Sequence, residues 1–225
     1  MHTLSRIHSQ RGVSIIGLMI GSLISMLCIL TCMTMHKSLM QITVGSKTDA
    51  ILDSQIASSL MQIQHNLHNA GLGMGVTTAN DVVAEVDGSD VGLYWRYRNG
   101  GAFFCRGVLE QNYTDTASNT TGRKIVQVQA TTDCNANSTL TDLEWTPTNT
   151  LAQFRNQSHQ LFSFNVIQAS CTPYGLSAAI TDRLQVNVTT TSSAQLAGAN
   201  VSAIQYQYCL PNAYTTAINP NAISS

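Results

Sequence analysis

Residues 13–35 read VSIIGLMIGSLISMLCILTCMTM, and this run decides the fold prediction because it contains no Asp, Glu, Lys or Arg. The preceding residues 1–12, MHTLSRIHSQRG, contain two arginines and no acid. About 23 residues of helix, at about 1.5 Å each, cover the ~30 Å hydrocarbon layer of a bilayer. Because the basic residues come first, the positive-inside rule predicts a cytoplasmic N-terminus and places the bulk of the chain outside.

Several kinds of targeting segment have an apolar run of this kind. A cleaved secretory signal needs small residues after the run, and residues 29–35 offer no A-x-A site. A lipoprotein signal would use Cys32, but residues 29–31 are not the small residues expected before an acylated cysteine. An uncleaved signal anchor is a third possibility. A fourth places the cut before the run, between Gly12 and Val13.

The residues Arg11-Gly12-Val13-Ser14 combine a basic flank, a glycine and an apolar helix with serine in second place. This arrangement resembles the class III leader of type IV prepilins. The resemblance implies cleavage by a prepilin peptidase between Gly12 and Val13, and N-methylation of Val13. The sequence departs from the family pattern in two places: Val13 replaces the usual Phe, and Gly17 replaces a glutamate at the fifth mature position.

The missing glutamate bears on assembly. In the family, that carboxylate neutralises the N-terminal amine of a neighbouring subunit, and a charge left unpaired in a bilayer is costly. Family members without it sit at the filament tip, with no subunit ahead of them. The resemblance therefore implies a tip or near-tip position for a subunit with Gly17.

Small residues recur along the apolar run at intervals of three and four. Gly17 to Gly21 is a G-x-x-x-G motif, and small residues let helices approach closely in lipid. Small residues are also common in membrane helices without such a role. The small-residue stripe consists of Ser14, Gly17, Gly21, Ser25, Cys28 and Cys32.

The helical pattern continues beyond the apolar run. Apolar residues at 52, 56, 60, 63, 67 and 70 have the spacing of an amphipathic helix, and Gly71 is a suitable C-terminal cap. We therefore expect a leader at 1–12, a transmembrane and polymerisation helix at 13–36, an amphipathic half at 37–71 and a globular head at 72–225.

The head has the alternating pattern of an antiparallel β structure, so the fold class is α+β. The turn sequence Asn99-Gly100-Gly101 predicts a hairpin. Regions near 112–122, 133–139 and 190–200 read as loops. The expected strands are 82–86, 91–97, 102–109, 124–130, 140–145, 161–168, 183–189 and 201–210.

The end of the helix refines the resemblance. Residues 59–74, SLMQIQHNLHNAGLGM, are similar to the helix end of PilW-type minor pilins, and residues 182–186 and 204–209 are similar to the closing strands of that group. The pilin-like fold is thereby expected: one long helix followed by a β-rich head.

Four cysteines in the head fit two disulfides in an oxidising compartment, because charged residues are only 10% of the chain and no C-x-x-C pair is present. Four cysteines allow three pairings. We favour Cys105–Cys134 with Cys171–Cys209, since sequential pairs close loops of modest length.

We find no pattern that predicts an enzyme, a cofactor or a metal site. His65 and His68 have a metal-compatible spacing but no nearby acid or cysteine, which favours solvated histidines. The strand 95–98 predicts Trp95 and Tyr97 in the core with its two arginines on the surface. A loose acidic cluster at 81, 85, 87 and 90 lacks EF-hand spacing.

The net charge of −1, and of −3 after loss of the leader arginines, argues against a direct nucleic-acid partner. The expected function is that of a minor pilin, which helps to initiate a filament for motility, adhesion or DNA uptake. Its expected partners are other minor and major pilins, a tip adhesin, the prepilin peptidase and the inner membrane. A minor pseudopilin of a type II secretion system and a signal-anchored periplasmic binding protein are the alternatives.

Overall fold

The structure is a computed structural model that describes residues 14–116, 119–131, 134–173 and 180–215. Its contacts divide the chain into an N-terminal unit, Met1–Thr48, and a globular unit, Asp49–Ser225. Helix α1 (Ile15–Leu67) contributes to both units. The division by contacts at Thr48 lies inside the segment 37–71 that the sequence analysis treated as one half of the helix.

Within the globular unit, α1 buries the predicted apolar stripe. Leu52, Ile56, Leu60, Ile63 and Leu67 are each at most 9% exposed, which confirms the spacing argument. A helix turns once in 3.6 residues, so positions three and four apart lie on one face. The residues of that face belong to one hydrophobic core together with residues of both sheets.

The helix ends at Leu67, slightly earlier than the cap at Gly71 had indicated. The chain then forms a turn in which the Ala70 amide donates a hydrogen bond to the Leu67 carbonyl, three residues earlier, at 2.9 Å. Gly71 has a φ of +75°, and a Cβ there would lie 2.5 Å from the Asn212 carbonyl oxygen. Glycine is therefore required where the helix passes into the sheets, because of both its conformation and the close approach.

The first sheet, sheet A, is antiparallel with its five strands in chain order. The predicted hairpin is confirmed: Asn99 pairs with Ala102, and Gly100 and Gly101 have φ of +58° and +90°. Positive φ at both central positions is the requirement of a type I′ turn. The strands are β1 (Val82–Asp87), β2 (Asp90–Asn99), β3 (Ala102–Asp115), β4 (Thr120–Ala130) and β5 (Trp145–Arg155).

The strand expected at 140–145 is wrong. Leu140–Asp142 is instead a 3-10 turn, η2, with Leu140 buried and its carbonyl accepting a hydrogen bond from the Trp145 indole at 3.1 Å. The strand begins at Trp145 and continues to Arg155, where no alternation had indicated one. The loop expected at 112–122 is also largely strand, because β3 and β4 extend into it.

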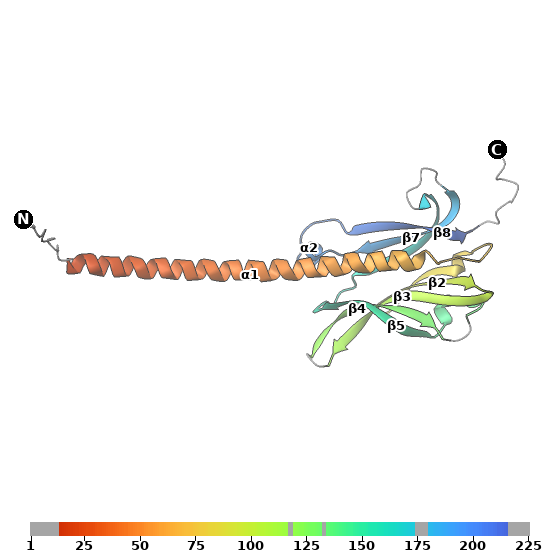
Figure 1. The fold of residues 1–225 in the computed structure, drawn as a ribbon, viewed down its shortest axis with the longest axis horizontal. Helices are drawn as coiled ribbons and strands as arrows, with labels where there is room; N and C mark the ends of the chain where they lie inside the picture. Colours follow the sequence, from red (N-terminus) through yellow and green to blue (C-terminus); the bar gives the residue numbers. More distant parts are fainter. Residues whose placement is uncertain (1–13, 117–118, 132–133, 174–179, 216–225) are drawn as a thin grey trace, which may run out of the picture. The chain divides into compact units, whose positions relative to one another are not determined.

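The second sheet, sheet B, contains β6 (Phe162–Cys171), β7 (Ile180–Thr190) and β8 (Ile204–Tyr214) in that order. A short helix, α2 (Ser193–Leu196), lies in the region 190–200 that was expected to be a loop. Asp53 of α1 accepts hydrogen bonds from the Ser193 amide at 2.9 Å and its hydroxyl at 2.7 Å. This contact ties the loop between β7 and β8 to α1; Figure 1 shows α2 beside that helix.

A buried carboxylate joins the two sheets. Glu110 of β3 is fully buried and accepts hydrogen bonds from the backbone amides of Leu161, at 2.9 Å, and Phe162, at 2.8 Å. Its remaining partner is the Arg123 guanidinium of β4, also buried, with Nε 2.9 Å from the carboxylate. The Glu110–Arg123 pair thus fixes the start of sheet B against sheet A.

The two disulfides are those that the sequence analysis favoured. Cys105 is bonded to Cys134, and Cys171 to Cys209, with Cα atoms 5.7 Å apart in each case. The first bridge belongs to a second, smaller core on the other face of sheet A, where Leu140 and Val126 are buried. The second joins β6 to β8, the two outer strands of sheet B.

Candidate functional site

The apolar part of α1 is the first candidate site. Described residues 14–51 are all exposed, and Ile15, Leu18 and Met33 each have about two thirds or more of their surface free. An 18-residue window of this helix is long and apolar enough to cross a membrane, and none of it is buried. So large an apolar surface is unfavourable in water, and the segment is therefore a candidate single membrane span.

The small-residue stripe lies within this exposed segment. A Cβ added at Gly17 or Gly21 would meet nothing within 4 Å, so no contact with a described residue requires glycine at either position. Ser14 and Ser25 continue the stripe at helical spacing, and Cys28 and Cys32 are exposed free thiols. A packing role for the stripe therefore needs a partner helix.

The predicted cleavage site lies next to this segment. Gly12 and Val13 fall outside the described residues, so the structure says nothing of the bond between them. Described helix geometry begins immediately after, with the Leu18 amide donating to the Ser14 carbonyl at 3.1 Å.

The prediction for the strand 95–98 is wrong for one arginine. Trp95 is buried as expected and Arg98 is exposed, but Arg96 is only 2% exposed. Its Nε lies 2.6 Å from the Asp81 carboxylate, and its Nη1 donates to the Asn135 carbonyl at 2.6 Å. A buried guanidinium needs this set of acceptors, because the charge loses its hydration.

Asp81 therefore belongs to an ion pair rather than to the acidic cluster. It also accepts a hydrogen bond from the Thr78 amide at 2.5 Å, which completes a capping box at the short helix η1 (Ala79–Asp81). In the described part of the chain, no group of three His, Cys, Asp or Glu side chains is placed to hold a metal ion.

Sequence reasoning missed the Glu110–Arg123 pair. Glu110 follows Val108 by two positions in β3, and Val108 is fully buried. Since alternate residues of a strand face the same side, continuing the alternation beyond Leu109 would have predicted that Glu110 is buried. The expected strand ended at 109, so this signal was not used.

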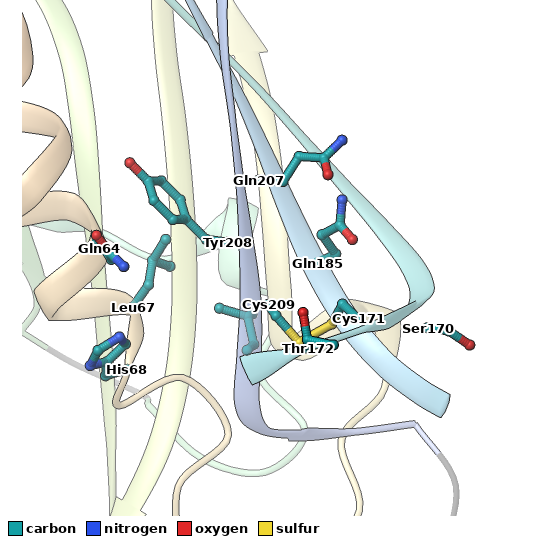
Figure 2. Close-up of a pocket in the computed structure, with 11 residues that line it drawn as sticks. Gln64, Leu67, His68, Ser170, Cys171, Thr172, Gln185, Gln207, Tyr208 and Cys209 are labelled. Carbon is teal, nitrogen blue, oxygen red and sulfur yellow. A yellow bond between two sulfur atoms is a disulfide. The ribbon is translucent and has the colours of Figure 1, made fainter. Parts of the chain in front are cut away.

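The second candidate site is a cavity of about 530 Å³ between the end of α1 and the outer strand β8. Figure 2 shows the Cys171–Cys209 disulfide among its lining, with Leu67 and His68 on the α1 side. Gln185 and Gln207 add amide groups. Most of its described lining residues are polar, and they include the His68 imidazole but no carboxylate or lysine.

No family model, curated protein or solved structure matches this chain at a significant level. The α+β layout, the apolar N-terminal helix and the two disulfides are thus properties of the structure itself. The pilin resemblance depends on the leader motif and the helix pattern.

Proposed function

We propose that this protein is a minor pilin of a type IV pilus, which helps to initiate the filament and is located at or near its tip. One observation supports the proposal above the others. The same helix has an exposed apolar segment and a segment whose apolar stripe is buried in a disulfide-containing α+β unit. The prepilin-like motif directly precedes that helix.

The apolar segment has two environments in this proposal. Before assembly it spans the inner membrane as a single-pass helix, with the head in the periplasm. In the filament, helices of other minor and major pilins replace the lipid. The open space around Gly17 and Gly21 allows a neighbouring helix to approach closely.

Gly17 supports the tip position. A subunit without a carboxylate at this place offers no partner for the N-terminal amine of another subunit, so it suits a position with no subunit ahead of it. A tip adhesin would then contact the head. The filament would serve motility, adhesion or DNA uptake, with no direct role for this chain in binding nucleic acid.

The N-terminus of the protein recovered from membranes tests the proposal. We expect mass spectrometry to find a mature chain that starts with N-methylated Val13, and only the Met1 form in cells without the prepilin peptidase. An intact Met1 start in peptidase-positive cells would make the protein a signal-anchored periplasmic protein. A lipidated start at Cys32 would make it a lipoprotein.

The second candidate is a minor pseudopilin of a type II secretion system, because that class shares the leader and the helix-plus-head plan. Deletion of the gene separates the two. Loss of surface filaments with normal protein secretion supports the pilus, and the reverse supports the secretion system. In the pilus case, Gly17→Glu is expected to reduce filament number or remove the protein from the tip. If filament number and tip labelling are both unchanged, the argument from charge fails.

A further inference from the structure

An acidic cavity lies on sheet A of the globular unit. It has a volume of about 200 Å³, and its lining includes the carboxylates of Glu85, Asp87 and Asp90 together with the rings of Tyr94 and Trp145. The acids come from β1 and from the first residue of β2, and Trp145 is the first residue of β5. Strands distant in sequence therefore form one recess with both negative charge and aromatic surface.

The negative charge of this cavity is only partly neutralised by the described residues. Neither Glu85 nor Asp87 forms a salt bridge with a described basic side chain, and Asp90 lies 3.8 Å from an Arg123 that is already bonded to Glu110. Desolvation raises the pKa of Glu85, and the nearby carboxylates of Asp87 and Asp142 raise it further. A cation in the cavity would remove that repulsion.

Tyr94 provides a second, independent indication of a ligand. Its side chain is only 5% exposed, and its ring lies over two glycines: a Cβ at Gly92 would be 2.4 Å from the Tyr94 hydroxyl, and one at Gly107 would be 2.5 Å from the ring. The indole of Trp145 stacks on the ring at a centroid distance of 4.5 Å.

The Tyr94 hydroxyl therefore lies over Gly92, which also lines the cavity, and it has no hydrogen-bond partner among the described residues. The hydroxyl is not among the side-chain atoms that are sealed from solvent without a partner, so it is open to the cavity, where a ligand with N–H groups can donate a hydrogen bond to it. Burial raises the pKa of Tyr94 to about 12, and the charges of Glu85, Asp90 and Asp87 add to this effect, so the phenol stays neutral.

The size and chemistry of the recess distinguish between kinds of cation. No three described His, Cys, Asp or Glu groups converge as a metal ion requires, and about 200 Å³ is far larger than one metal ion needs. An ammonium or guanidinium group has several N–H donors for separated carboxylates and attracts aromatic rings. We propose that this cavity binds an alkylammonium or guanidinium cation, as a free amine or as a lysine or arginine side chain of a partner protein.

Isothermal titration calorimetry on the full chain in detergent micelles tests this proposal. The probes are agmatine, which has both cationic groups, and N-acetyl-arginine amide, which imitates a protein side chain. N-acetyl-citrulline amide has nearly the same shape without the charge and is the matched neutral ligand. We expect both cations to bind, the citrulline compound not to bind, and affinity to fall when the salt concentration rises.

Variants connect the binding to the cavity. Glu85→Gln and Asp87→Asn are each expected to weaken binding by up to about fivefold, the upper limit for a solvent-accessible ion pair. Glu144→Gln is the matched control, because Glu144 is exposed, follows η2 closely and does not line the cavity. Glu85→Gln relieves repulsion, so the unfolding midpoint should not fall.

The two sources of the cation give different rankings. Tighter binding of N-acetyl-arginine amide indicates a partner side chain, and tighter binding of agmatine indicates a free amine; both agree with the proposal. Three results would overturn it: equal binding of the citrulline compound, no binding of either cation, or unchanged affinity in both Glu85→Gln and Asp87→Asn. Calcium binding that depends on Glu85 would identify a metal site instead.

Discussion

Glu110→Ala is the most informative single substitution, because the structure specifies everything that it disrupts. The change removes the carboxylate from Arg123, which is 1% exposed, and leaves the amides of Leu161 and Phe162 without their acceptor. Breaking a buried ion pair by removing one partner costs about 3–5 kcal/mol. Orphaned amides add to that cost where water cannot reach them.

We therefore expect Glu110→Ala to lower the free energy of unfolding by at least about 3 kcal/mol, which is more than a hundredfold in the unfolding equilibrium. Urea denaturation of the oxidised protein in mild detergent, followed by Trp fluorescence, measures this loss. Glu144→Ala removes an exposed carboxylate and should change stability by no more than about 0.5 kcal/mol.

A double variant separates the ion pair from the amide contacts. Glu110→Leu combined with Arg123→Met removes both charges, so no unpaired ion remains in the core. We expect it to be more stable than Glu110→Ala but less stable than the natural chain, because Leu161 and Phe162 still lack an acceptor. A loss below about 1 kcal/mol in Glu110→Ala would refute the view that this carboxylate holds the two sheets together.

Three further outcomes are expected from the same unfolding assay. Arg96→Met should lower the free energy of unfolding by about 3 kcal/mol or more, because it leaves the buried Asp81 carboxylate unpaired. Arg98→Met, at the exposed position two residues further on, should lower it by at most about 0.5 kcal/mol. Equal losses in the two variants would contradict the burial of Arg96. Cys171→Ser opens a bridge with a sequence separation of 38 and should cost about 4 kcal/mol, and a reductant should abolish the difference from the natural chain. Burial raises the pKa of both Tyr94 and Tyr208 to about 12. The unfolded chain loses these phenol protons at a lower pH than the folded chain, so the free energy of unfolding should fall as the pH rises from about 10 to 12. Tyrosinate absorbance measures the ionisation, and loss of both protons from the folded protein at pH 10 would contradict this expectation.

Much of the fold could be predicted where local pattern and tertiary packing agree. The stripe from Leu52 to Leu67 has helical spacing because one face of α1 is buried, and Gly100 and Gly101 fix the β2–β3 turn by their own conformation. The prediction failed at β5, where Trp145 begins an edge strand with mostly exposed polar residues. An edge strand of this kind has no alternation to read.

Charged residues in the core were the other failure. The alternation along a strand assigns each residue to one face of the sheet. It does not predict whether an arginine on the buried face has a carboxylate partner from elsewhere in the chain. Arg96 is buried because Asp81, 15 positions earlier, is brought to it by the fold. Likewise, the sequence shows the small-residue stripe around Gly17 and Gly21. The partner helix in the proposed packing belongs to another molecule, so its position cannot be predicted from this chain.

The disulfides have a mechanical consequence for the globular unit. A chain pulled from its two ends cannot extend the segments between Cys105 and Cys134, or between Cys171 and Cys209, which have sequence separations of 29 and 38. At about 3.4 Å per residue, roughly 230 Å of contour length cannot be extended while the bridges are intact. Stretching this protein in a force spectrometer should therefore give a shorter extension under oxidising conditions, and a reductant should release the missing length in two steps.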